Sequence, residues 1–389
     1  MPSRLVRYLV ALGAFCLPLM LGAAPAGAAT FLSTVVASGL NNPRGLTFGP
    51  DGGLYIAESG ISFGAGSGGG PSFSSSGSIT RLFGGTSTRI VTGLPSIYSP
   101  VTNAVSGPQD ISFDLSGNGY VVVGLGADPA IRAPGSTLGH VLKFSSDGSV
   151  SDFTDVSAYE ADFNPAGGTI DSNPYHLAAG GSGFYVTDAG ANALYSLSTS
   201  GIVSPEAIFP DRFIGPPPPL SNPVPTGVTL GPDGTIYVGE LTGFPFTQGA
   251  ANIYSIAPGS GVASLFATGF TNLTDLTFGP DGNLYALSYD LDGILGPQTE
   301  GGIFKVLADG TFERVYSTGL INPAGLAIGN DGSFYVSIFS DGPAGAGQVL
   351  RVSAVPEPAT WAMLLLGFLA IGSVTRRSKG FSSKLAAQI

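Results

Sequence analysis

"GLTFGPDGGLYIAE", at residues 45–58, reads as a strand, a tight turn and a second strand. In the Gly-Pro-Asp-Gly turn, Asp can accept hydrogen bonds from the turn's own backbone and Gly tolerates a positive φ. The same phrase recurs as "GVTLGPDGTIYVGE" at 227–240, "DLTFGPDGNLYALS" at 275–288 and "GLAIGNDGSFYVSI" at 325–338. A hairpin repeated in this way indicates a repeat architecture, in which Asp51 and its counterparts are most simply turn formers.

The tyrosine after each turn marks six repeats. These tyrosines are Tyr55, Tyr120, Tyr185, Tyr237, Tyr285 and Tyr335, with spacings of 65, 65, 52, 48 and 50 residues. Within the first repeat, apolar and polar residues alternate over four short segments: 45–48, 54–58, 78–82 and 88–92. Alternation of this kind is typical of strands, and units of this length with four strands are typical of propeller blades. The sequence therefore predicts an all-β fold, a six-bladed β-propeller with four-stranded blades.

The two ends of the repeat region predict how the ring closes. The sixth repeat stops after its third strand, at 347–353, whereas an unattached strand at 33–39 precedes the first repeat. That strand resembles 314–319, a fourth strand of the preceding repeat. We expect the N-terminal strand to complete the last blade, which leaves no open sheet edge.

The N-terminal residues 1–28 have the pattern of a signal peptide. Arg4 and Arg7 precede an apolar stretch, and the small residues 26–28 suit a signal peptidase. We therefore expect export of the domain at 30–354. The sole cysteine, Cys16, lies in the signal peptide, so the exported domain has no thiol.

The C-terminal segment 355–379 has three parts in a fixed order. The tripeptide Pro356, Glu357 and Pro358 is followed by an apolar run at 359–374 and then by basic residues, before a tail at 380–389. This order resembles the PEP-CTERM sorting signal, which implies recognition by an exosortase and release of the helix after export. An ordinary transmembrane tail anchor is the alternative, although the run is shorter than the about 20 residues usual for a span. Both readings place the domain in the periplasm, on the outer surface or in the extracellular matrix.

The charge of the exported domain bears on its partners. The two ends hold six of the 15 basic residues and only one of the 26 acidic residues, so the domain is more negative than the chain's −11. Such a surface repels phosphate backbones, which excludes nucleic acid as an expected partner. We expect a monomer whose acidity serves solubility or attracts cations.

One face of the predicted ring gathers most of its polar residues. The inner strands begin there with Gly45, Asp110, His176, Gly227, Asp275 and Gly325, and second strands end there with Glu58, Asp188, Glu240 and Ser288. The longer connections, including 60–77 and 240–252, emerge at the same mouth, and loops on a rigid scaffold often carry function. Phe244 and Phe246 lie in one of these loops, as an apolar lip or packed beneath it. We expect this acidic, loop-rich mouth to bind a ligand or partner.

Three interpretations of these groups stay open. In the first, these polar side chains only line a solvated channel. In the second, a Ca²⁺ ion, which takes six to eight oxygen ligands, is held by Asp110, Asp275, Glu58 and Glu240. In the third, His176 is a general base whose pKa is raised by nearby acids. The other histidine, His140, precedes a third strand and receives no role. No Ser-His-Asp order, nucleophilic cysteine or dinucleotide fingerprint is present, so the sequence contains no recognised catalytic motif.

Several stretches resemble the ScyD/ScyE family, and the resemblance covers about residues 33–353. The most specific are "YVGELTGFPF" at 237–246 and "DSNPY" at 171–175, together with 41–60, 185–197 and 266–287. The resemblance implies an exported NHL-like propeller, of a family named after the gene cluster for the pigment scytonemin, and it carries over no catalytic residue. Two departures are the Gly/Ser-rich first mouth loop and His176, where relatives commonly have glycine.

These observations favour an accessory protein that binds a small molecule, an exopolysaccharide or a protein. A Ca²⁺-dependent hydrolase of the lactonase or arylesterase type is one alternative, by fold analogy. A structural protein of the extracellular matrix is the other.

Overall fold

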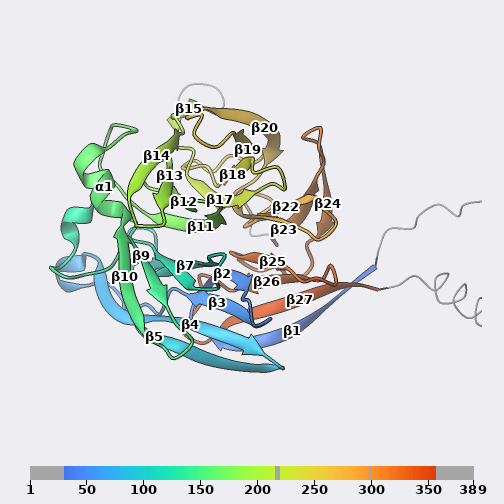
Figure 1. Cartoon of the computed structure of the whole chain (residues 1–389), viewed down its shortest axis with the longest axis horizontal. Coiled ribbons are helices and arrows are strands. Elements are labelled where there is room, and N and C mark those ends of the chain that lie inside the picture. The colour runs from blue at the N-terminus through green and yellow to red at the C-terminus, as the bar shows by residue number, and fades with distance from the viewer. Residues whose placement is uncertain (1–29, 215–219, 298–299, 356–389) are drawn as a thin grey trace, which may run out of the picture. The chain divides into compact units, whose positions relative to one another are not determined.

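The strands of the protein are arranged as blades around a central axis (Figure 1). The computed structural model describes residues 30–214, 220–297 and 300–355. Within these residues the chain forms six sheets of four or five antiparallel strands and one two-stranded ribbon. The prediction of an all-β, six-bladed propeller is confirmed.

Successive segments of the chain form successive blades. Blade one contains β2 (Pro43–Phe48), β3 (Leu54–Glu58), β4 (Ser72–Phe83), β5 (Thr86–Ser99) and β6 (Ala104–Ser106). Blade two contains β7 (Pro108–Phe113), β8 (Gly119–Val123), β9 (His140–Phe144) and β10 (Val150–Asp155). Blade three contains β11 (Pro174–Gly180), β12 (Gly183–Asp188), β13 (Ala193–Ser198) and β14 (Val203–Ile208).

The second half of the ring repeats this order. Blade four contains β17 (Pro225–Leu230), β18 (Ile236–Glu240), β19 (Ala251–Ile256) and β20 (Ala263–Phe270). Blade five contains β21 (Leu273–Phe278), β22 (Leu284–Ser288), β23 (Gly302–Val306) and β24 (Phe312–Tyr316). Blade six contains β25 (Leu326–Ile328), β26 (Phe334–Ile338), β27 (Gly347–Val355) and β1 (Thr30–Leu40). The connections add α1 (Val156–Phe163), two short 3₁₀ turns, η1 (Ser67–Gly69) and η2 (Pro129–Ile131), and the ribbon of β15 (Arg212–Phe213) and β16 (Leu220–Ser221).

The closure of the ring follows the prediction. β1, at the N-terminus of the described chain, is the outer neighbour of β27 in the last blade. Phe31 of β1 packs edge-on against Tyr316 of blade five, with ring centroids 5.9 Å apart. A strand from one terminus thus completes a sheet from the other, so separating the two requires breaking a blade.

The repeated turn is explained by hydrogen bonds within the turn. Asp51 accepts a bond of 3.0 Å from the amide of Gly53, and Gly52 has a φ of 75°. The Tyr55 hydroxyl donates to the same carboxylate at 3.1 Å. Equivalent amide bonds form at Asp233, Asp281 and Asp331, which confirms these residues as turn formers.

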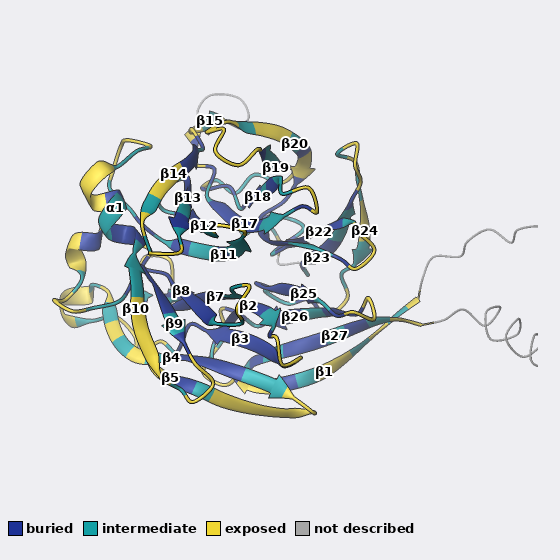
Figure 2. Cartoon of the chain, viewed as in Figure 1, coloured by how far each residue is buried: buried dark blue, intermediate teal, exposed yellow. Residues whose placement is uncertain are grey.

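The same tyrosine also joins neighbouring blades. The ring of Tyr55 lies 4.9 Å from that of Phe113 in blade two, and Tyr120 lies 4.5 Å from Phe184 in blade three. The repeated pairs are completed by Tyr237 with Phe278, Tyr285 with Phe334 and Tyr335 with Phe48. Aromatic pairs of this geometry contribute about 1 kcal/mol each beyond their buried area. Buried residues fill the blades around the axis, while exposed ones lie on outer strands and loops (Figure 2).

Two connections differ from the prediction. The Gly/Ser-rich first mouth loop, at 60–77, is partly strand, because β4 begins at Ser72 and pairs Phe73 with Ile97 of β5. The connection between blades two and three contains a helix, α1, in a chain predicted to be all-β. Asp155 caps its first turn by accepting from the Ala158 amide at 2.9 Å. Alternation is weak in both segments, so pattern alone missed these elements.

The predicted signal peptide, sorting tripeptide and apolar run at 359–374 lie outside the described residues. Inside them, the helices are all too short or too polar to span a bilayer.

Candidate functional site

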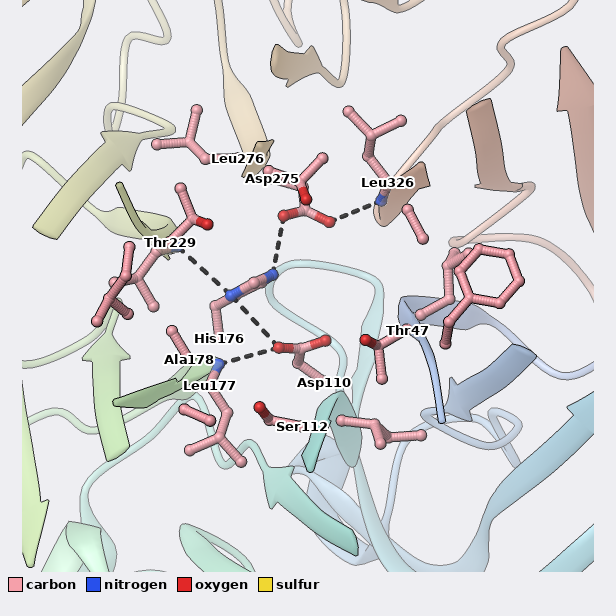
Figure 3. A pocket seen from close by; sticks show the side chains of 18 of the residues that line it. Thr47, Asp110, Ser112, His176, Leu177, Ala178, Thr229, Asp275, Leu276 and Leu326 are labelled. Atoms are coloured by element: carbon pink, nitrogen blue, oxygen red, sulfur yellow. Dashed lines mark hydrogen bonds and ion pairs between the residues drawn. The ribbon is translucent and has the colours of Figure 1, made fainter. Parts of the chain in front are cut away.

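Three side chains from three blades meet on the axis of the ring (Figure 3). They are Asp110 of β7, His176 of β11 and Asp275 of β21, each the residue predicted to open an inner strand. The His176 ring lies between the carboxylates, with Nδ1 3.3 Å from Asp110 Oδ2 and Nε2 2.8 Å from Asp275 Oδ1. The side chains of the two aspartates are 4% and 3% exposed, so the group is a buried Asp-His-Asp cluster.

Gly227, which lies in blade four between His176 and Asp275, lets the inner strands β17 and β21 pack closely. A Cβ atom on Gly227 would lie 2.6 Å from the Leu276 nitrogen and 2.8 Å from the Asp275 Cα. Real Cβ atoms do not approach backbone this closely, so a side chain there would force β17 and β21 apart. Gly45 leaves similar room beside Asp110, because its Cβ would lie 2.9 Å from the Asp110 Cα.

Each member of the cluster also faces the backbone of the following blade. Asp110 accepts from the Leu177 amide at 2.9 Å, and Asp275 accepts from the Leu326 amide at 2.6 Å. The Val228 amide lies 3.4 Å from His176 Nδ1. A protonated Nδ1 can pair with the Asp110 carboxylate, whereas an unprotonated Nδ1 could accept from the Val228 amide. The protonated state is favoured, because the amide contact is long and a buried charge pair is strong. We therefore assign a proton to both ring nitrogens.

The charges of the cluster follow from burial and from mutual attraction. Burial alone would lower the pKa of His176, but Asp110 and Asp275 raise it to about 9. Burial raises the pKa of Asp110 to about 6, against the opposing attraction of His176. Near pH 7 the imidazole is therefore a cation paired with the two carboxylates, a state in which it cannot accept a proton as a general base.

The cluster forms the floor of a pocket of about 390 Å³ in the central channel. Hydroxyl groups surround the floor, from Thr47, Ser112, Thr229 and Thr277. Apolar side chains follow, including those of Phe48, Leu230 and Ile328. Sites for small molecules commonly combine an apolar wall with a few convergent polar groups in this way.

The pocket opens toward the opposite end of the channel from the one the sequence predicts. Its walls are formed by residues that follow the cluster along each inner strand, such as 46–48 and 228–230, and that lead into the short turns. The long loops precede these strands. The cluster thus faces the short-turn side, whereas the sequence predicts a ligand site at the loop-rich mouth.

A second polar network lies on the loop side and was missed by the sequence analysis. Arg44, the residue before Gly45, donates to the Val105 carbonyl at 3.1 Å and pairs with Asp341 at 2.8 Å. Tyr289 donates to the other oxygen of Asp341 at 3.1 Å. Burial lowers the pKa of Arg44, but the combined effects of Asp341, Tyr175 and Tyr289 raise it overall. Arg44 is the only basic residue directly before one of the six residues predicted to open an inner strand, and that was the available signal.

Glu58 lies inside blade one and not in the channel pocket. Its carboxylate is fully buried and accepts from the Asn41 amide at 2.6 Å and from Thr80 Oγ1 at 2.5 Å. Arg89 pairs with the same group at 2.8 Å. These bonds join the loop before blade one to its outer strands, so Glu58 has a structural role.

Asp188 and Glu240 have the corresponding roles in blades three and four. Asp188 accepts from Ser172 Oγ and from the Asn173 amide, both at 2.6 Å, and burial raises its pKa to about 6. Glu240 pairs with Arg212 of β15 and accepts from the Asn252 amide at 2.9 Å; burial raises its pKa to about 7. Neither residue lines the channel pocket.

The remaining predicted residues lie in the loop after β18. Phe244 is 70% exposed, and its ring lies edge-on to that of Phe246 at 6.4 Å. Phe244 therefore projects from the loop and is not packed beneath it.

The carboxylates proposed as calcium ligands do not share one site, since Glu58 and Glu240 bind arginines while Asp110 and Asp275 flank His176. In the part of the chain that the structure describes, no three His, Cys, Asp or Glu side chains are arranged to hold a metal ion.

A larger cavity, of about 730 Å³, lies beside α1 on the loop side. Glu160 and Asp171 are among its lining residues, and burial raises the pKa of Glu160 to about 7. Tyr195 donates to Glu160 at 3.0 Å. These acids were not predicted, because nothing in their spacing marks them.

Comparison with known proteins supports the fold and the sorting signal. Residues 354–379 match the PEP-CTERM protein-sorting motif, which confirms the predicted signal and indicates export and processing by an exosortase. A search of the curated proteins gave no significant match.

Solved structures of similar fold share little sequence with this chain. A gluconolactonase from Xanthomonas campestris is 11% identical with a TM-score of 0.52, over 83% of this chain and 89% of that one. A glucose dehydrogenase is 14% identical with a TM-score of 0.54, over 83% and 100%. An auxiliary nutrient binding protein from Bacteroides thetaiotaomicron is 8% identical with a TM-score of 0.52, over 84% and 76%. At these identities the likeness shows the fold alone. The chain is therefore an exported six-bladed β-propeller that carries a PEP-CTERM sorting motif.

Proposed function

We propose that this protein is an accessory protein of the cell exterior that binds a small hydroxylated molecule in its channel pocket. The observation that carries the proposal is the buried Asp-His-Asp cluster at the floor of a pocket of about 390 Å³. A structural role alone does not account for a charged cluster that faces an open volume lined by hydroxyl groups. Hydroxyl ligands can donate to the carboxylates and accept from the threonine and serine side chains.

The motifs quoted above further support a place in the ScyD/ScyE family. Such a place favours an accessory role over a catalytic one, because the resemblance brings no catalytic residue. The substrate of a pigment pathway is not implied by the pocket itself, whose walls suit polar molecules as well as aromatic ones.

A hydrolase of the lactonase or arylesterase type is the main alternative, and the propeller fold is compatible with it. The charge of His176 weighs against a His176 general base, since a pKa near 9 keeps the ring protonated at neutral pH. A purely structural role in the extracellular matrix predicts no affinity for small molecules.

The proposal is tested by calorimetric titration of the purified protein with D-glucitol, D-glucamine and D-gluconate, which share a six-carbon polyol chain. We expect at least one of them to bind at a single site with a dissociation constant below about 1 mM. The substitution His176→Gln should abolish this binding.

The matched control is His140→Gln, because His140 is also buried between two aspartates. Its Nδ1 lies 2.9 Å from Asp152 and its Nε2 lies 3.1 Å from Asp155, away from the channel. This variant should bind as the unmodified protein does. Equal loss in both variants, or no binding of any polyol, would contradict the proposed function.

A further inference from the structure

The six residues that open the inner strands have an approximate two-fold pattern. In blade order they are Gly45, Asp110, His176, Gly227, Asp275 and Gly325. A rotation by three blades places Gly45 on Gly227 and Asp110 on Asp275, but it places His176 on Gly325. The two aspartates are thus equivalent, and only one side of the pair has an imidazole.

The two sides of the aspartate pair therefore differ in their hydrogen-bond donors. On one side His176 spans the pair through both ring nitrogens. On the other side the equivalent strand begins with Gly325, and the pocket wall consists of Leu326, Ala327 and residues 46–48. Figure 3 shows His176 on the side of Thr229 and the opposite side occupied by Thr47 and Leu326.

The cluster also has more negative than positive charge. Two carboxylates face one imidazolium, and Arg44, on the loop side, is already paired with Asp341. Asp275 Oδ1 is buried, and within the described residues its one polar contact is the ion pair with His176 Nε2 at 2.8 Å. One imidazolium therefore serves two buried carboxylates, and buried negative charge without a matching cation is unfavourable.

We infer that the ligand carries a protonated amine, which binds between Asp110 and Asp275 on the side of Thr47, opposite to His176. The inference rests on the proposed function and names the chemical class of its ligand. The ammonium group contacts the two carboxylates from the pocket, and it supplies three donors. The hydroxyl groups of the ligand then lie along the ring of Thr and Ser side chains.

The matched polyols test the charge of the ligand directly. D-Glucamine should bind at least about tenfold more tightly than D-glucitol, because hydrogen bonds between charged groups are stronger than neutral ones. D-Gluconate should bind more weakly than D-glucitol. The substitution Asp275→Asn should reduce the preference for the amine to within about threefold, whereas Asp152→Asn, outside the channel, should preserve it.

The side of the cluster on which the amine binds is tested with a second matched pair of variants. Thr47 and Thr229 are equivalent under the rotation by three blades, and both line the pocket. Thr47→Val should weaken binding of D-glucamine more than Thr229→Val, and both changes preserve side-chain shape. The reverse order would overturn the assigned side.

The remaining outcomes separate this inference from the proposed function. If D-glucitol and D-glucamine bind equally and both need His176, the proposed function stands and the cationic ligand is wrong. If CaCl₂ displaces D-glucamine better than NaCl does at equal ionic strength, a metal ion occupies the site and the amine is wrong. If none of the polyols binds, the proposed function itself fails.

Discussion

The protonation of His176 at alkaline pH is the most direct consequence of the channel cluster. The substitution His140→Gln leaves His176 as the only imidazole in the chain. Its ring should stay protonated through neutral pH and lose its proton only near pH 9, because Asp110 and Asp275 flank it.

The size of the effect follows from the shift in proton affinity. The pKa of His176 rises from 6.5 to about 9, and a tenfold change in proton affinity corresponds to 1.36 kcal/mol, so the cluster stabilises the folded state by about 3 kcal/mol. A raised folded-state pKa gives stability that is complete below pH 6.5 and is lost as the pH rises through about 9. The raised folded-state pKa of Asp110 acts at lower pH, where the stability that this group contributes is lost as the pH rises from 3.8 to about 6.

Two measurements check this expectation. Proton NMR of the His140→Gln variant should show one imidazole that titrates near pH 9. Urea unfolding should give a free-energy difference between the unmodified protein and His176→Gln that falls by about 3 kcal/mol between pH 6.5 and pH 10. A ring that titrates near pH 6.5, or a difference that is the same at both pH values, would refute the assigned charge state.

Three further predictions concern the scaffold. Gly227→Ala should lower the free energy of unfolding by about 2 kcal/mol, because the new Cβ meets the backbone of β21. Gly181→Ala, at a position with open space, should lower it much less, and thermal unfolding compares the two variants. Deletion of residues 30–39 should destabilise the whole ring, since β1 completes blade six, and an unchanged urea midpoint would contradict that closure. Arg44→Met should cost up to about 3 kcal/mol, because it leaves the partly buried Asp341 without its cation; stability equal to the unmodified protein at pH 7 would show that the pair contributes nothing net.

The sequence by itself determined the architecture, because the features that build a blade are local. Asp51 and Gly52 form their turn from bonds within a few residues, and Tyr55 reaches the same carboxylate from four residues away. The count of repeats and the unmatched strand near residue 33 then predicted six blades and the closure by β1. The positions of Asp110, His176 and Asp275 at the start of inner strands were predicted in the same way.

Only the tertiary structure decided which acidic residues belong together. The sequence groups Glu58 and Glu240 with Asp110 as candidate ligands, but Glu58 pairs with Arg89 of β5, and Glu240 pairs with Arg212 of the β15–β16 ribbon. The direction of the pocket was also decided by packing, since its lining residues come from the inner strands of all six blades. The unpredicted pair of Arg44 and Asp341 joins residues separated by 297 positions. Contacts at such separations depend on how blades pack and how far each side chain reaches, and the pattern of one repeat does not contain that information.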